Sequence, residues 1–177
     1  MISASVRNLR IVAVLTILGW GLFCSWPAFA TSHVTSKDTE LFVKAVGFAK
    51  PSDGSPVKVA IVYNPQNEDS YKDAILASSL LNDYEGSGRR FESKIIEMGR
   101  DASAPVAFIM AGAEKSAGRL TKQKVLTVAL NPDCVISQDC VMAIVTEPKI
   151  DIYVSRKASE LAGIQFGSAF LMMVKEY

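Results

Sequence analysis

The sequence predicts an α/β fold: a three-layer sandwich around a mostly parallel sheet, with an antiparallel hairpin near the C-terminus. Short, continuously apolar runs such as Val57–Tyr63 and Pro105–Met110 alternate with longer amphipathic segments, as buried parallel strands alternate with helices. Later, two strand-like runs at Cys140–Thr146 and Lys149–Ser155 are separated by only two residues. That connection is too short for a crossover, so these two strands must pair as a hairpin.

Residues 1–30 have the three parts of an export signal. Two arginines make a positive start, a nearly continuous apolar run follows over 11–23, and the segment ends in Ala28-Phe29-Ala30. Small residues at both ends of this triplet fit cleavage after Ala30, so we expect a signal peptide over 1–30 and a single domain over 31–177. An uncleaved membrane anchor is the alternative, but the apolar run is short for a span of about 20 residues.

Cleavage changes both the charge and the cysteine count. Loss of Arg7 and Arg10 moves the formal net charge from +1 to −1, and loss of Cys24 leaves Cys134 and Cys140 as a pair. The periplasm of a Gram-negative cell favours disulfides, so a structural bond between these two is expected. Their spacing is not C-x-x-C, which leaves a thioredoxin-type redox site unsupported. A second interpretation is that the clamped loop shapes a partner surface.

The first half of the domain is expected to run helix, strand, helix, strand. A helix capped by Ser36 or Asp38 has an apolar stripe to about Lys50, and a turn rich in Pro and Ser ends it. The strand Val57–Tyr63 follows. The next helix is expected over 68–84 and the next strand over 91–98, with a Gly-Ser-Gly turn between them.

The second half contains two more buried strands and then the hairpin. Strands over 105–110 and 125–130 flank a polar helix over 113–124. Asn131–Gln138 is predicted as a loop that the two cysteines bound. After the hairpin, a short helix over 158–162 ends at a glycine, and the apolar segment 164–174 is predicted as a last helix.

No catalytic, cofactor or metal site is expected from the motifs. The one histidine, His33, lies in a polar segment over 31–37 that should fray, so a Ser-His-Asp hydrolase or a zinc site lacks members. Glu114-Lys115-Ser116 lacks the glycines of a Walker motif and is interpreted as a helix start. Gly86–Arg90 could cradle an anion, but a solvated turn is expected. The near-neutral charge argues against nucleic acid as a partner.

Two sets of polar residues keep alternative interpretations open. Asn64 and Asn67 follow the first strand, where open α/β sheets often bind ligands, yet turn formation and helix capping explain them equally well. Asp69 and Asp73 stand four apart on one helix face and could bind a cation, although a solvated helix surface is the commoner meaning.

An ordered series of short motifs over residues 125–174 resembles the YfiR-like family of periplasmic proteins. The series consists of Val125-Leu126-Thr127-Val128, Asn131-Pro132-Asp133-Cys134, Cys140, Ile150-Asp151-Ile152-Tyr153-Val154-Ser155, Ala158, Ala162-Gly163-Ile164, Phe166, Ser168 and Leu171. In the order of its elements the resemblance extends over the whole domain. The chain departs from the family after the first helix, where Ala49-Lys50-Pro51 keeps only the proline of an aromatic-Trp-Pro signature.

The resemblance implies a non-catalytic periplasmic regulator without a cofactor. A characterised member of the family binds and represses the periplasmic region of an inner-membrane diguanylate cyclase, and loss of repression raises cyclic-di-GMP and biofilm formation. Cys134 and Cys140 match the family's late cysteine pair. For this chain the expected partner is thus the periplasmic domain of an inner-membrane signalling protein, a diguanylate cyclase or a sensor kinase, and not nucleic acid.

Two alternatives concern what the domain binds. A periplasmic small-ligand-binding protein of the substrate-binding type would use the loops after Tyr63 and around Gly112, at the strand ends. A homodimer is a further candidate assembly, because Phe166 and Phe170 stand four apart and could form an exposed apolar stripe. Packing of that stripe into the core is the expectation.

Overall fold

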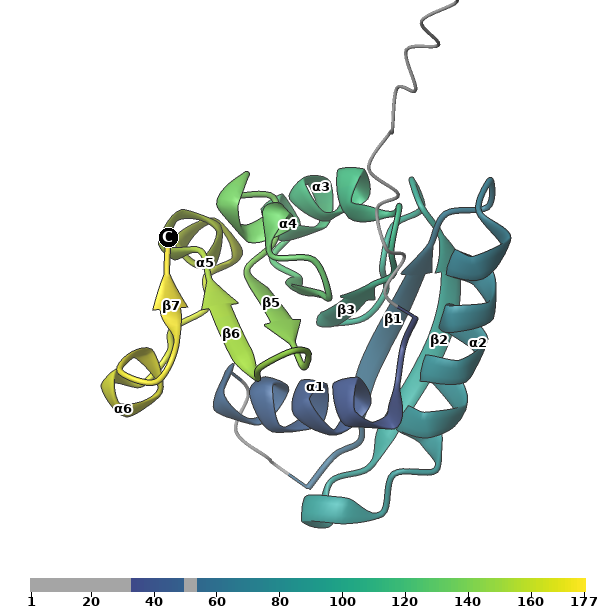
Figure 1. Ribbon diagram of the computed structural model, residues 1–177, viewed down its shortest axis with the longest axis horizontal. Coiled ribbons are helices and arrows are strands. Elements are labelled where there is room, and N and C mark those ends of the chain that lie inside the picture. Colours follow the sequence, from purple (N-terminus) through teal and green to yellow (C-terminus); the bar gives the residue numbers. More distant parts are fainter. Residues whose placement is uncertain (1–32, 50–53) are drawn as a thin grey trace, which may run out of the picture. The chain divides into compact units, whose positions relative to one another are not determined.

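One mixed sheet organises the domain in the computed structural model, which describes residues 33–49 and 54–177 (Figure 1). Its strand order is β2-β1-β3-β4-β5-β6-β7. Neighbouring strands pair in parallel, except that β5 and β6 form the predicted antiparallel hairpin. The strands are β1 (Val57–Tyr63), β2 (Phe91–Glu97), β3 (Val106–Ile109), β4 (Leu126–Ala129), β5 (Met142–Val145), β6 (Asp151–Val154) and β7 (Lys175–Glu176).

The helices connect these strands. They are α1 (Ser36–Ala49), α2 (Glu68–Asn82), α3 (Ala117–Lys122), α4 (Asp133–Ile136), α5 (Arg156–Ala162) and α6 (Ser168–Leu171), with 3-10 turns η1 (Gly86–Gly88) and η2 (Glu114–Ser116). In the part of the chain that the structure describes, no helix has the length and apolarity needed to cross a membrane. The predicted signal peptide over 1–30 lies outside the described residues.

Two apolar cores, one on each face of the sheet, make the predicted three layers. Alternation along β1 sends Val59 and Ile61 to a core shared with α1 and α2, and Ala60 and Val62 to a core shared with α3 and α4. Residues Val59 to Val62 are all buried, as the continuous apolar run predicts for a strand that is covered on both sides.

The strand order places a reversal of winding beside β1. The chain passes from β1 through α2 to β2 on one side, and then adds β3, β4 and β5 on the other side. The carboxyl ends of β1 and β3 therefore flank the position where open α/β sheets bind ligands. These two strands are hydrogen-bonded neighbours, with Val62 opposite Ile109.

The C-terminal segment corrects one prediction. Residues 164–174 do not form a continuous helix: α6 has four residues, and β7 then pairs in parallel with β6, with Lys175 opposite Tyr153. Phe166 and Phe170 do not form the stripe of one helix, and their aromatic rings instead pack on each other and on Phe48. The Phe170 ring, which is buried, lies 5.1 Å from that of Phe166 and 4.6 Å from that of Phe48 between centroids. Packing of Phe170 into the core is thus confirmed.

The segment between the cysteines is the second correction, because it is not simply a loop. Asp133–Ile136 form the short helix α4, and the Asn131 side-chain oxygen accepts a hydrogen bond of 2.9 Å from the Asp133 amide at its start. Cys134 and Cys140 are joined by a disulfide with 5.2 Å between their Cα atoms. The bond ties α4 to the chain just before β5.

Smaller differences concern where helices begin and end. The helix predicted over 68–84 ends at Asn82, and the one predicted over 113–124 starts as the turn η2 before it becomes α3. Gly118 lowers the helix propensity of α3, and a side chain there would require the Asp139 side chain to move. A Cβ atom at this position would lie 2.5 Å from a carboxylate oxygen of Asp139.

Candidate functional site

The loop after β1 is organised by two asparagine side chains. Asn67 caps α2: its side-chain oxygen accepts hydrogen bonds from the Asp69 amide at 3.0 Å and the Ser70 amide at 3.3 Å. The Asn64 side-chain oxygen accepts from the Gln66 amide at 3.0 Å. Turn formation and capping therefore do explain both residues. Because both oxygens accept from backbone amides, the Nδ2 groups of the two side chains remain as donors.

Those two amide nitrogens converge on Gly112, in the loop after β3. Gly112 has φ +82°, and a Cβ atom there would lie 3.3 Å from Asn64 Nδ2 and 3.7 Å from Asn67 Nδ2. Only glycine fits such a position easily, because it allows positive φ and leaves room for the amides. Neither Nδ2 group donates to another of the described residues, so two hydrogen-bond donors remain available where the winding of the sheet reverses.

A shallow pocket of about 370 Å³ adjoins the same loop. It is lined by Tyr63, Pro65, Gln66, Asn67, Glu68 and Tyr71. The rings of Tyr63 and Tyr71 lie 5.0 Å apart between centroids and are tilted by 49°. The Tyr63 hydroxyl donates to Glu97 at 3.3 Å. Burial raises the pKa of the Tyr63 phenol and the negative charge of Glu97 raises it further, so Tyr63 keeps its proton.

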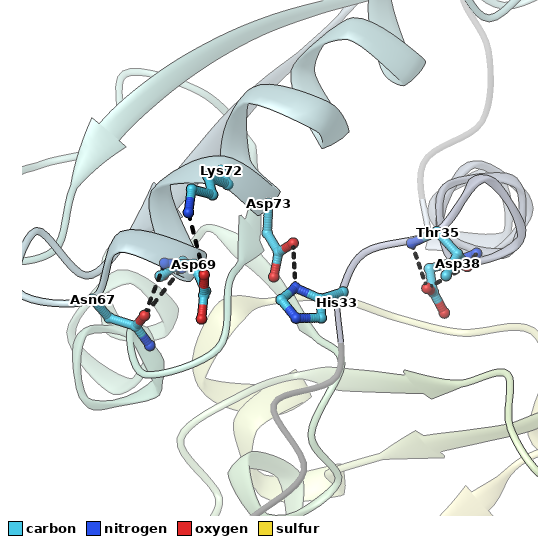
Figure 2. A network of polar contacts seen from close by, with 8 residues as sticks. His33, Thr35, Asp38, Asn67, Asp69, Lys72 and Asp73 are labelled. Atoms are coloured by element: carbon cyan, nitrogen blue, oxygen red, sulfur yellow. Dashed lines mark hydrogen bonds and ion pairs between the residues drawn. The ribbon is translucent and has the colours of Figure 1, made fainter.

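Residues 33–35, which precede α1, are anchored, and this corrects the expectation of fraying for the described part of the segment. Val34 is 3% exposed, and Nδ1 of His33 lies 3.3 Å from the Asp73 carboxylate on α2 (Figure 2). Asp73 itself is buried, and Asp69 instead lies 3.7 Å from Lys72. The two aspartates therefore have different partners and do not form a cation site. No local pattern indicates the His33–Asp73 contact, because it joins residues 40 positions apart.

A buried carboxylate fixes the start of α1. Asp38 accepts from the Thr35 amide at 2.8 Å and the Thr35 hydroxyl at 2.6 Å, and the Asp38 amide donates back to that hydroxyl (Figure 2). This reciprocal arrangement is a capping box, so Thr35, rather than Ser36 or Asp38, caps the helix. The Thr146 hydroxyl, after β5, also donates to Asp38. A cavity of about 180 Å³ beside them is lined partly by Leu130 and Glu147.

The remaining candidates have structural roles. The Cys134–Cys140 bond is present, Glu114–Ser116 starts a helix as expected, and Gly86–Gly88 form a 3-10 turn. Within 33–49 and 54–177, no group of three or more His, Cys, Asp or Glu side chains is placed to hold a metal ion.

Apolar side chains are exposed around α6. We call Phe48, Leu171, Met172 and Met173 the C-terminal apolar surface. Met172 is 82% exposed, Met173 67% and Phe48 50%, and Leu171 is partly buried. Clustered exposure of large apolar side chains is characteristic of surfaces that contact a partner. No motif in the sequence indicates this surface, because the apolar spacing over 164–174 predicts a helix with its stripe in the core.

Comparison with known proteins supports the fold. No family model and no curated protein matches the chain. A conserved domain protein from Vibrio cholerae superposes with a TM-score of 0.57 and 12% identity, over 79% of this chain and 60% of that one. An ABC domain in complex with L-Trp from Streptococcus pneumonia superposes with a TM-score of 0.56 and 9% identity, over 80% of this chain and 59% of that one. The chain thus spans about three fifths of the length of each, and the likeness is one of fold.

Proposed function

We propose that this protein is an exported regulator that binds the periplasmic domain of an inner-membrane signalling protein and represses it. A diguanylate cyclase is the favoured partner and a sensor kinase the other candidate. Repression requires the regulator to bind one state of its partner more tightly than the other. The resemblance over residues 125–174 suggests the partner class, and the C-terminal apolar surface is the observation that carries the proposal.

That surface has the properties expected of a contact site. Met172 and Met173 are flexible, polarisable side chains that adapt to the shape of a partner, and their exposure leaves apolar area that binding would remove from water. Phe48 is anchored by its stacking on the buried Phe170 ring, so the surface has a rigid part beside its flexible part. The disulfide fits an oxidising compartment.

The test is capture of membrane proteins by the purified, tagged protein. The wild type should retain a membrane signalling protein with a periplasmic domain, and the double variant Met172→Glu/Met173→Glu should lose it. Ile75→Glu is the matched control, because Ile75 is 47% exposed on α2 and outside the C-terminal apolar surface. Retention by the double variant, or capture of no signalling protein by the wild type, would refute the proposal.

A second candidate function is the binding of a small ligand in the periplasm. The observation that favours it is the convergence of Asn64 Nδ2 and Asn67 Nδ2 on Gly112 at the strand ends. The ABC domain with a similar fold was solved with a small molecule, L-Trp, which is in keeping with ligand binding by this architecture. A rise in the unfolding temperature of the wild type with a periplasmic metabolite, absent in Gly112→Val, would support this candidate. Equal rises for the wild type and Gly112→Val would exclude the site at Gly112.

A further inference from the structure

The pocket beside the loop after β1 has an aromatic wall. Tyr71 projects from α2 with 45% of its surface exposed, and its ring meets that of Tyr63 at 5.0 Å. The Tyr63 hydroxyl is used by Glu97, whereas the Tyr71 hydroxyl contacts no hydrogen-bonding group among the residues that the structure describes. A flat ligand face can therefore stack on Tyr71 while the Tyr71 hydroxyl stays free to bond with a polar substituent.

Neutral polar groups surround this wall. Gln66 offers an amide that can both donate and accept, and Asn67 offers the Nδ2 donor left over from capping α2. Since the Asn67 oxygen is already bonded to backbone amides, its donor direction is fixed before any ligand arrives. Such a set suits hydroxyl groups, because a hydroxyl donates one hydrogen bond and accepts others.

The charges at the pocket disfavour ionic ligands. Among the described residues that line the pocket, Glu68 is the one that carries a charge, and Lys72 lies 2.7 Å from its carboxylate, so the pair carries no net charge. No Lys, Arg or His is among those lining residues, so an anion would lack a cationic partner, and a cation would find the Glu68 carboxylate already paired. A purely apolar ligand is also disfavoured, because it would bury the amides of Gln66 and Asn67 without replacing their hydrogen bonds to water.

We propose that the pocket at Tyr63, Gln66, Asn67 and Tyr71 binds a neutral saccharide, with one sugar face stacked on Tyr71 and hydroxyl groups bonded to the two amides. This inference rests on the second candidate function, small-ligand binding at the carboxyl end of β1, and names its ligand class. The open form of the pocket, about 370 Å³ in volume, suits one or two sugar rings of a longer chain.

The experiment combines a glycan array with calorimetric titration of the full chain. Array hits, with glucose, N-acetylglucosamine and maltose, are titrated into the wild type, Tyr71→Ala, Tyr71→Phe and Ile75→Ala. We expect Tyr71→Ala to weaken saccharide binding by about tenfold and Tyr71→Phe by about threefold, since Phe keeps the ring but loses the hydroxyl. Ile75 is exposed on the same helix, so Ile75→Ala should bind like the wild type.

The outcomes separate this proposal from the function on which it rests. Absence of any retained glycan, or equal saccharide affinity of Tyr71→Ala and the wild type, overturns the saccharide pocket. Choline and glutamate serve as cationic and anionic probes, and binding of either in place of saccharides overturns the ligand class. A metabolite whose binding depends on Gly112 but not on Tyr71 leaves small-ligand binding intact and refutes the pocket.

Discussion

The Thr146 hydroxyl donates a hydrogen bond of 2.6 Å to the Asp38 carboxylate and so joins two residues that are 108 positions apart. Asp38 is 6% exposed and Thr146 7%. The same carboxylate closes the capping box with Thr35, so one buried charge serves both the start of α1 and its attachment to the chain after β5. Hydrogen bonds to such a charged group are stronger than neutral ones.

Asp38→Ala should lower the free energy of unfolding by about 2–3 kcal/mol, because it removes a helix cap and leaves the buried Thr146 hydroxyl without its acceptor. Urea denaturation measures this loss. Glu40→Ala is the control: Glu40 pairs with Lys44 on the solvent side of α1, so its loss should change the free energy of unfolding little. Equal effects of the two substitutions would contradict the role given to Asp38.

Gly112→Ala should destabilise the protein by about 1–2 kcal/mol, because the left-handed conformation is unfavourable for a residue with a Cβ atom. The new methyl group would also displace the Asn64 amide, which NMR of the side-chain NH₂ signals can follow. Gly167→Ala is the control, since no atom of the described residues lies within 4 Å of its Cβ position. Gly167 has φ −66°, which residues with a Cβ atom adopt readily, so Gly167→Ala should lower the free energy of unfolding less than Gly112→Ala.

Loss of the Cys134–Cys140 bond should lower the free energy of unfolding by about 2 kcal/mol, since the bond closes a short loop in the unfolded chain. The double substitution Cys134→Ser/Cys140→Ser, unfolded in urea, tests this value, and reductant should then have no further effect. Mass spectrometry adds a direct check. Alkylation of both cysteines in protein isolated from cells, without prior reduction, would show that the bond does not form in the cell.

Thr127→Val should lower the free energy of unfolding by about 1–3 kcal/mol, because the buried Val141 amide would lose the hydroxyl to which it donates a hydrogen bond of 2.9 Å. The Thr127 hydroxyl also lies 2.8 Å from that of Thr121, which donates to the Asp139 carbonyl. The double substitution with Thr121→Val should therefore show coupling. Additive losses in a double-mutant cycle would mean that the two hydroxyls act independently.

The pairing of β6 with β7 should depend on pH at both extremes. The hydrogen bond from Lys175 lowers the pKa of the Asp151 carboxyl, and Asp151 raises that of Lys175. The stabilisation that ionised Asp151 gives to the folded state is therefore present above its unfolded pKa of about 3.9, and it is lost as the pH falls through its lowered folded-state pKa. The stabilisation that charged Lys175 gives is present below its unfolded pKa of about 10.4, and it is lost as the pH rises through its raised folded-state pKa.

Hydrogen exchange of the Tyr177 amide, which donates to the Val154 carbonyl, follows this pairing. Protection should decline in acid for the wild type, whereas Asp151→Asn should show little acid dependence. Glu40→Gln, at a distant ion pair on α1, should behave like the wild type. An acid decline that persists in Asp151→Asn would assign the pH dependence to another group.

The order of elements could be predicted from the sequence because it rests on apolar runs. The strands β1, β3 and β4 are buried on both faces, and such strands produce continuous apolar runs. The C-terminal segment could not be predicted in this way. Phe166 and Phe170 have helical spacing, but their rings are placed by contacts with each other and with Phe48, which is more than 100 residues earlier.

The candidate sites could be predicted only in part, for a similar reason. The sequence places Asn64 and Gly112 at strand ends, so their meeting could be anticipated from parallel pairing. Nothing in the local pattern indicates which amide atom faces the crevice, because that depends on the bond from Gln66. The contacts of Asp38 with Thr146 and of His33 with Asp73 are long-range, and they leave no periodic trace in the sequence.

The strand order also sets a sequence of assembly events. Apart from β2, which adds to the other edge of β1, each strand from β3 onward joins a sheet edge that already-synthesised chain provides. The sheet can therefore grow in the order of synthesis, with little loop entropy lost at each step. The attachment of α1 is the exception, because Thr146 is supplied only after β5. The hydrogen bond between Asp38 and Thr146 therefore forms only after β5 has been synthesised, and it closes a loop of 108 positions.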